Sequence, residues 1–417
     1  MFERKLKGGL GSRVWLLCLL TAALGIQPVP AARAAEERQN GAVASPAKVT
    51  PPGRRTWDFP EDGVTFDSQF SASRLSECTR QGPGEYRVVT APENRPINQS
   101  AWFAFKVSAS TPREIRVHLN CDGAPLRYRP KISVDGLRWL PLPAEAIEKG
   151  TDKNSATLRL EVGEEPLWVA AQEIVDGARL EAWSRTMERL PFVERSEIGR
   201  SVLGAPLYKL EITGAREPGF VVIVGRQHPP EVTGSLALMH FVETLVGDTP
   251  VARAFREEFS VLVVPLVNPD GVEQGHWRHN ARGVDLNRDW EEFRQPETRV
   301  VRDQILALRD RGRVFLHLDF HSTYHDVFYT QADELPSTPA HFAARWVEGI
   351  RGRFPDYPAK TVVNHLPKSN TSHNWAYRTL GVPAITYEIG DNTDRTLLRQ
   401  IADGAAQEMM TLLLEMK

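Results

Sequence analysis

Two regions of the chain differ in the spacing of their hydrophobic residues. In the first, residues 56–183, apolar and polar positions alternate over short stretches such as 115–121, a period of two that is typical of strands with one buried face. Asp135 and Gly136 lie between two further stretches of this kind and predict a hairpin turn. Because short strands follow one another with Pro- and Gly-rich connections, we expect a small antiparallel β-sandwich domain here.

The second region, residues 184–417, contains continuous apolar runs that alternate with segments of helical period. The apolar runs predict strands buried on both faces, at residues 221–224, 261–267, 314–320 and 383–389. The helical spacing predicts helices at residues 232–246, 297–309, 340–352 and 396–416. We therefore expect an α/β domain with a mixed, largely parallel sheet and helices on both faces, in which a site forms at the carboxyl ends of the strands.

The N-terminal segment has the order of parts found in a secretory signal peptide. Basic residues precede an apolar run at 14–26, and a small-x-small site follows at 32–34; the basic residues are Lys5, Lys7 and Arg13. The apolar run is shorter than the roughly 20 residues that span a bilayer, so a membrane anchor is the less favoured alternative. We expect residues 1–35 to be a signal peptide, residues 36–55 a linker, and the protein to be secreted or periplasmic, without stable membrane insertion after signal cleavage.

Composition and charge narrow the classes of partner. The chain has 417 residues, of which 41% are hydrophobic and 25% charged, as expected for a globular protein of two folded units. The net charge of −2 gives no reason to expect a nucleic acid as partner. Removal of the signal peptide would leave Cys78 and Cys121, which either form a disulfide or remain buried thiols. Nucleophilic-serine and nucleotide-binding motifs are missing from the sequence.

His228 and Glu231 form an His-x-x-Glu pair between a predicted strand and the helix that follows it. Imidazole nitrogens and carboxylate oxygens are ligands of zinc, and a catalytic zinc site needs three protein ligands and an open position. The pair alone is weak evidence, because a chain with 11 histidines and 53 acidic residues contains such spacings by chance. A third ligand is therefore required.

His321 is the best candidate for this third ligand, because it follows the strand predicted at residues 314–320. A histidine at the carboxyl end of one strand can join a site at the end of a neighbouring strand. His317 falls in the middle of the same strand, where a packed histidine is expected, and His325 falls in the following loop.

A polar segment around Asn287 and Arg288 offers an amide donor next to a guanidinium fork, which suits a terminal carboxylate. A solvated, charged loop is the alternative reading of this pair alone.

Four motifs occur in an order that resembles the zinc carboxypeptidases of the metallocarboxypeptidase A family. They are the His-x-x-Glu pair, Gly-Val-Asp-Leu-Asn-Arg at 283–288, Phe-His-Ser at 320–322 and Ala-Ile-Thr-Tyr-Glu at 384–388, and the likeness covers roughly residues 191–417. The N-terminal region is similar to the β-sandwich that precedes the catalytic domain in the cytosolic carboxypeptidase branch. Arg278 stands nine residues before Asn287, a spacing that is similar to the one in that branch.

The resemblance implies a role for each motif residue. One Zn²⁺ ion would be held by His228, Glu231 and His321. The catalytic residues would be Glu388, as a general base towards water, and Arg278, which would stabilise the oxyanion. The substrate carboxylate would be bound by Asn287 and Arg288, and Asp285 would orient His228 through its second ring nitrogen.

The resemblance also implies a substrate: a peptide with a free C-terminal carboxylate, from which one amino acid is hydrolysed. His373 stands fifteen residues before Glu388, where the family sets its preference for the last side chain, and we expect a polar or acidic residue to be preferred. The tyrosine expected twenty-two residues before Glu388 is replaced by Leu366. The alternatives are an amidase of cell-wall stem peptides or a deacylase of N-acyl amino acids on the same scaffold, and a binding protein without activity.

Overall fold

The computed structural model describes residues 48–214, 219–358, 360–364 and 368–417, which belong to one compact unit, Ser45–Lys417. The predicted signal peptide, most of the predicted linker and Leu366 lie outside the described residues. Within the predicted linker, residues 48–55 form no helix or strand but are fastened to the rest of the unit. The Thr50 N–H donates to the Glu93 carbonyl at 2.7 Å, and Arg54 forms an ion pair with Glu273.

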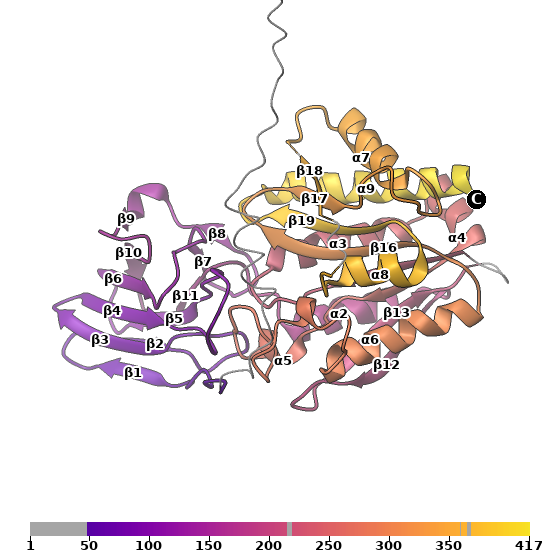
Figure 1. Cartoon of the computed structure of the whole chain (residues 1–417). Coiled ribbons are helices and arrows are strands. Elements are labelled where there is room, and N and C mark those ends of the chain that lie inside the picture. Colours follow the sequence, from indigo (N-terminus) through magenta and orange to yellow (C-terminus); the bar gives the residue numbers. More distant parts are fainter. Residues whose placement is uncertain (1–47, 215–218, 359, 365–367) are drawn as a thin grey trace, which may run out of the picture. The chain divides into compact units, whose positions relative to one another are not determined.

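The N-terminal region consists of two sheets with a shared apolar core (Figure 1). The six-stranded sheet has the order β1-β2-β5-β11-β7-β8, with bounds Thr56–Phe59, Val64–Asp67, Ala104–Ala109, Leu167–Ala170, Lys131–Ser133 and Leu140–Pro141. The five-stranded sheet has the order β3-β4-β6-β10-β9, with bounds Glu77–Gly82, Glu85–Thr90, Arg113–Cys121, Ser155–Val162 and Ile147–Lys149. The predicted hairpin is confirmed, since β7 pairs antiparallel with β8. The predicted alternation is also confirmed, because every second side chain of β6 is buried.

The two cysteines of this region are buried free thiols. Cys78 lies on β3 and Cys121 on β6, and β4 lies between these strands. Neighbouring strands are about 4.8 Å apart, so the separation exceeds the roughly 7 Å that a disulfide can bridge between Cα atoms. Burial raises the pKa of each thiol to about 12. The sequence left open a disulfide or two buried thiols, and the structure contains two buried thiols.

The C-terminal region is built on an eight-stranded sheet with the order β12-β13-β15-β14-β16-β19-β17-β18. The strand bounds are Val193–Arg200, Pro206–Ile212, Phe259–Val264, Gly219–Gly225, Val314–Thr323, Ala384–Gly390, Val327–Thr330 and Lys360–Val363. The four central strands, from β15 to β19, pair in parallel, whereas β12, β13 and β17 add antiparallel pairs towards the edges. The predicted mixed, largely parallel sheet is thus confirmed.

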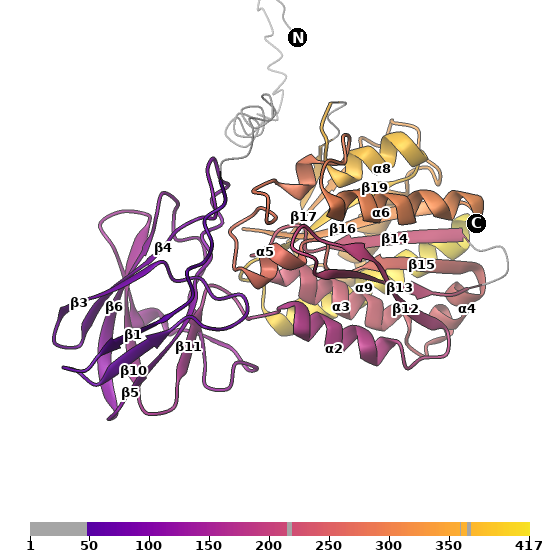
Figure 2. The ribbon, with the colours of Figure 1, turned by 90° about the horizontal axis from the view of Figure 1, so that it is seen from below.

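Helices cover both faces of this sheet (Figure 2). One face packs against α2, α3, α4, α7 and α9, with bounds Gly177–Met187, Val232–Leu245, Pro250–Glu258, Phe342–Arg353 and Arg395–Met416. The other face packs against α6 and α8, with bounds Pro296–Ala307 and Ser372–Leu380. The short α5, Pro269–Glu273, lies between β15 and the loop that follows. Side chains of β14 point alternately to the two faces of the sheet. Val221 and Ile223 pack in the core with α3 and α9, and Phe220, Val222 and Val224 pack in the core with α6 and α8. Burial on both faces explains why this strand is apolar throughout.

The predicted central strands and the predicted helices are confirmed, each within a few residues of its expected bounds. The strands towards the edges of the eight-stranded sheet were not predicted, and neither were the helices α2, α4, α5 and α8. The boundary predicted between residues 183 and 184 falls inside α2, whose Leu180 packs in the sandwich core and whose Trp183 packs in the core of the α/β region. Within the described ranges, no helix has the length and apolar character needed to cross a membrane.

Candidate metal centre

The candidate ligands meet because two parallel strands deliver them to one edge of the sheet. β14 and β16 are neighbours with Gly225 level with Phe320, so the chain that leaves β14 passes beside His321. His228 lies in the turn after β14, and Glu231 is the N-cap residue directly before α3. Ligand atoms of the three side chains all lie within 4.8 Å of one another, and all three side chains are buried.

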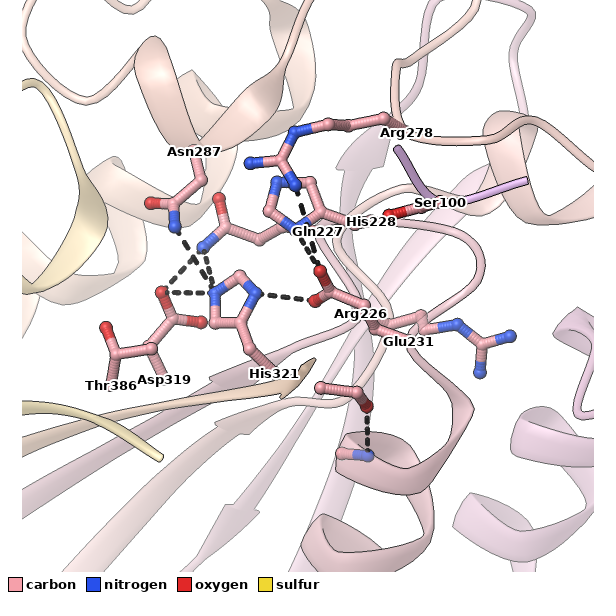
Figure 3. Close-up of polar contacts among 12 residues, drawn as sticks. Ser100, Arg226, Gln227, His228, Glu231, Arg278, Asn287, Asp319, His321 and Thr386 are labelled. Carbon is pink, nitrogen blue, oxygen red and sulfur yellow. Dashed lines mark hydrogen bonds and ion pairs between the residues drawn. The ribbon is translucent and has the colours of Figure 1, made fainter. Parts of the chain in front are cut away.

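Both imidazoles point the same ring nitrogen at the Glu231 carboxylate (Figure 3). His228 Nδ1 lies 2.8 Å from Glu231 Oε1, and His321 Nδ1 lies 2.7 Å from Oε2. Burial alone raises the pKa of Glu231, but the two imidazoles outweigh it and hold the pKa well below its ordinary value. A donor set of two nitrogens and one carboxylate oxygen that leaves a fourth position open fits one catalytic zinc ion.

The second nitrogen of each imidazole is held by an aspartate. His228 Nε2 lies 3.0 Å from Asp285 Oδ1, a contact expected from the resemblance noted in the sequence. His321 Nε2 lies 2.9 Å from Asp319 Oδ2, which also accepts a hydrogen bond of 2.7 Å from the Gln227 side chain. Such contacts orient a metal-ligating histidine and increase its basicity. Asp319 and Gln227 were not predicted, although Asp319 stands two residues before His321 on a strand and so points to the same face.

Asp285 also connects the metal cluster with Arg278. Its Oδ2 accepts a hydrogen bond of 2.7 Å from Arg278 Nε, and Arg278 Nη1 lies 3.9 Å from Glu231 Oε1. The Asp285 side chain further accepts from the Asn287 backbone N–H at 2.9 Å, and thereby begins the short 3-10 helix Leu286–Arg288. One carboxylate therefore fixes His228, Arg278 and the turn that carries Asn287.

The two predicted carboxylate-binding residues take different positions. Asn287 is buried, with Nδ2 3.4 Å from His321 Nε2 and Oδ1 accepting from the Ser372 N–H at 2.9 Å. Arg288 is half-buried, and its Nη1 donates to the Asn287 carbonyl at 2.9 Å. Asn287 is thus beside the metal cluster, whereas the Arg288 guanidinium contacts the backbone of its neighbour.

Glu388 lies on β19 directly beside His321 on β16. Its Oε2 atom is buried and has no hydrogen-bond partner among the described residues. Burial raises the pKa of Glu388 above its ordinary value, and the Glu231 carboxylate raises it further. Two neighbouring carboxyl groups whose pKa values are shifted in opposite directions are typical of a site where one binds and the other transfers a proton.

Three further histidines that the sequence singled out, His317, His325 and His373, lie outside the metal cluster. His317 is wholly buried in β16 and hydrogen-bonds Ser372 Oγ at 2.8 Å, as expected for a packed histidine, and His325 is exposed in the loop after the strand. His373 is buried in the first turn of α8, with Nδ1 2.9 Å from Thr386 Oγ1 and Nε2 3.0 Å from the Asn364 carbonyl. Thr386 precedes Glu388 by two residues on β19, so the two side chains share a face of the strand.

Solved structures with a similar fold include metallo-carboxypeptidases. A metallo-carboxypeptidase from Burkholderia cenocepacia superposes with a TM-score of 0.73 and 20% identity, over 85% of this chain and all of that chain. A metallo-carboxypeptidase from Pseudomonas aeruginosa, in complex with (2-guanidinoethylmercapto)succinic acid, has a TM-score of 0.69 and 21% identity, over 84% of this chain. At this level of identity the likeness shows the fold.

Sequence relatives include several cytosolic carboxypeptidases. Cytosolic carboxypeptidase 2 of Danio rerio is 25% identical over 296 residues, 63% of this chain and 41% of that protein. The Homo sapiens protein of the same name is 32% identical over 306 residues, 64% of this chain and 34% of that protein. The chain thus spans less than half the length of these relatives. The model of the zinc carboxypeptidase family matches residues 180–409, more than half of the chain. This chain belongs to the zinc carboxypeptidase family, whose members use one zinc ion.

Proposed function

We propose that this chain is a zinc-dependent carboxypeptidase that hydrolyses the last peptide bond of a peptide with a free C-terminal carboxylate. The observation that carries the proposal is the meeting of three kinds of group within one buried cluster. A metal-binding set lies beside a guanidinium, Arg278, and a side-chain amide, Asn287. Such a set can bind water, a scissile carbonyl and a terminal carboxylate side by side.

The chemistry is divided among these residues. Zinc, when bound by His228, Glu231 and His321, supplies a Lewis acid that polarises a carbonyl and lowers the pKa of water. Glu388 takes the proton from the attacking water and delivers it to the leaving amine, a role that its raised pKa supports. Arg278, which is fixed by Asp285, stabilises the negative charge that develops on the carbonyl oxygen.

Recognition of the chain end makes the reaction that of an exopeptidase. The Asn287 side chain is oriented by its bond from the Ser372 N–H, so the amide group faces His321 and can donate to a carboxylate. Arg288 is half-buried and supplies a guanidinium for a bidentate contact. A substrate whose end is a carboxamide would leave both donors without their charged partner.

The preference for the terminal side chain is proposed from His373, as the sequence suggested. The His373 imidazole contacts Thr386, which shares a strand face with Glu388. The polar pair His373 and Thr386 therefore lies on the same side of the strand as the proposed general base. We expect peptides that end in a polar or acidic residue to be preferred to peptides that end in Phe. More efficient cleavage of C-terminal Phe than of C-terminal Glu would overturn this preference and leave the zinc chemistry intact.

The test is a comparison of substrates with mass-spectrometric detection of products. Matched peptides ending in Glu, Lys and Phe, the same peptides with a C-terminal carboxamide, cell-wall stem peptides and N-acyl amino acids are incubated with the zinc-loaded protein. Release of single C-terminal amino acids from the free acids and not from the carboxamides is expected. Cleavage confined to stem peptides or N-acyl amino acids would instead establish the amidase or the deacylase.

Metal dependence is tested in the same assay with a chelator and two histidine variants. His321→Ala is expected to abolish activity, whereas His325→Ala, in the exposed loop four residues later, is expected to retain it. Chelator-resistant cleavage would contradict the zinc mechanism. We also propose export of the protein, on the basis of residues 1–35, and fractionation of the producing cell tests this.

A further inference from the structure

The segment that carries Arg278 is held by a carboxylate from the N-terminal region. Glu93 lies in the connection between β4 and β5 and is wholly buried. Its Oε2 accepts from the Trp277 N–H at 2.8 Å, and its Oε1 accepts from the N–H groups of Arg278 at 3.1 Å and His279 at 2.7 Å. Three consecutive backbone N–H groups therefore point at one side chain from about 185 residues away.

Consecutive backbone N–H groups of this kind form a concave anion site, and hydrogen bonds to an ionised carboxylate are about twice as strong as neutral ones. Burial alone raises the pKa of Glu93, but the neighbouring His276 and His279 and the backbone donors outweigh it and lower the pKa. The carboxylate is thus suited to hold this stretch of backbone in one conformation.

The neighbouring residue, Asn94, holds the far end of the same loop. Its Nδ2 donates to the Gly283 carbonyl at 3.0 Å, and its Oδ1 lies 2.6 Å from His279 Nδ1. Gly283 has φ +75°, and a Cβ atom there would come within 2.3 Å of Asn94 Nδ2, so only glycine fits this approach. Glu93 and Asn94 together fasten residues 277–283.

The fastened loop delivers the Arg278 side chain to the cluster. Its guanidinium extends from this loop towards Glu231 (Figure 3), and Nε meets Asp285, which closes the other side of the loop and holds His228. A shift of the Arg278 backbone would therefore move the guanidinium relative to the metal ligands. Displacement by about 1 Å can lower a rate by about two orders of magnitude.

We propose that Glu93 is a positioning residue for Arg278, so that the sandwich region contributes to stabilisation of the transition state. This inference rests on the proposed function of Arg278. Glu93 itself touches backbone N–H groups and not the reacting atoms. On this proposal the effect of Glu93 on the rate passes through Arg278, which separates this role from a general contribution to stability.

The experiment compares Glu93→Gln with Asp62→Asn in the zinc-loaded full chain. Asp62 is a buried carboxylate of the same region that is bound by Arg80 and Tyr86, and it serves as a matched control. Glu93→Gln is expected to lower kcat by about 10- to 100-fold with KM changed less than about threefold, because Arg278 acts mainly in the transition state. Affinity for a phosphinate transition-state mimic should fall with kcat/KM, whereas affinity for the product amino acid should not. Asp62→Asn should leave these constants unchanged.

A double-mutant cycle with Arg278→Ala then decides whether the effect passes through Arg278. In the Arg278→Ala background, Glu93→Gln should change kcat less than about twofold. The proposal would be overturned if the losses of kcat from the two substitutions were additive or if Glu93→Gln lost its bound zinc. It would also be overturned if Glu93→Gln bound the phosphinate and the product amino acid with equally weakened affinity. If Glu93→Gln does not fold, Glu93→Asp, which keeps the charge with a shorter reach, is taken through the same cycle with an intermediate loss expected.

Hydrogen exchange gives a readout that does not depend on activity. The amides of residues 277–279 should exchange faster in Glu93→Gln than in the wild type and in Asp62→Asn. Unchanged exchange would overturn the proposal. If the wild type cleaves no peptide but these amides still respond, the proposed function fails while the contact of Glu93 with the loop stands.

Discussion

Arg127 and Asp391 form a bidentate ion pair between residues 264 positions apart in the chain. Arg127 Nε lies 2.7 Å from Asp391 Oδ2, and both side chains are almost fully buried. The same guanidinium donates to the Ser322 carbonyl, next to His321, and to Ser100 Oγ. Asp391 follows Glu388 by three residues, so this pair joins the N-terminal region to the ends of both strands that carry the site.

Breaking this pair should destabilise the protein strongly. Arg127→Ala leaves Asp391 buried without its partner, and a loss of about 3–5 kcal/mol in the free energy of unfolding is expected. Arg185→Ala, which removes an exposed ion pair on α2, should cost less than about 1 kcal/mol. Urea denaturation of both variants measures the difference, and equal costs would show that the buried pair contributes no more than a surface pair.

Removal of the metal should lower stability as well as abolish activity. Zinc that binds the folded state alone contributes about 4 kcal/mol when its free concentration is 1,000 times Kd. We expect a lower Tm after chelation, restored by added zinc. In His321→Ala, added zinc should have little effect on Tm. A Tm that does not change on chelation of the wild type would argue against a bound structural or catalytic ion.

Glu388→Gln should separate catalysis from metal binding. Glu388 is outside the His228–Glu231–His321 set, so the variant should keep one zinc per chain by elemental analysis. Its kcat should fall by about 10²- to 10⁴-fold, the contribution expected of a positioned general base. Activity close to that of the wild type would require a different proton acceptor.

Arg288→Lys should weaken recognition of the substrate end. A lysine keeps the positive charge but loses the planar fork of donors, so KM for free-acid peptides should rise about tenfold or more with a smaller change in kcat. The ratio of free-acid to carboxamide cleavage should shrink at the same time. An unchanged ratio would place carboxylate recognition on other residues.

Acid should destabilise the protein in part through Glu173. This carboxylate contacts Lys131 at 2.7 Å and Arg395 at 2.8 Å; burial alone would raise its pKa, but these partners lower it to about 2. A folded-state pKa below the unfolded value of 4.5 gives stability that is present above pH 4.5 and lost as the pH falls towards 2. The contribution is at most about 3 kcal/mol.

Glu173→Gln should therefore be less stable than the wild type at pH 7. The difference in the free energy of unfolding between the two proteins should decrease between pH 4.5 and pH 2. Urea denaturation over this range measures it, with the exposed Glu164→Gln as control. A gap that stays constant with pH would mean that the charge of Glu173 contributes nothing to stability.

The fold could be predicted where burial produces a clear pattern of apolar residues along the sequence. The central strands contain runs of apolar residues because both faces of the sheet are covered, so β14 and β19 could be located within two residues. The edge strand β18 has four exposed residues and no such pattern, and it was missed. α2 was missed because its apolar side chains are divided between two cores and give a weak period.

The candidate site was predictable only in its motif residues. His228, Glu231 and His321 fall at strand ends, where ligands gather, and the structure brings them together. Asp319 lies within an apolar run and has no local signal apart from its spacing to His321. Glu93 could not be found, because the hydrogen bonds to its carboxylate come from backbone N–H groups far along the chain, and a backbone N–H does not depend on the type of residue.

The contact between Glu93 and residues 277–279 has a consequence for biosynthesis. A ribosome releases the N-terminal half first, so the carboxylate waits for a loop that is made about 185 residues later. Contacts of such long sequence separation form late and slowly. On the proposed role of Glu93, a chain in which this contact has not yet formed would act on peptides more slowly than the fully folded molecule.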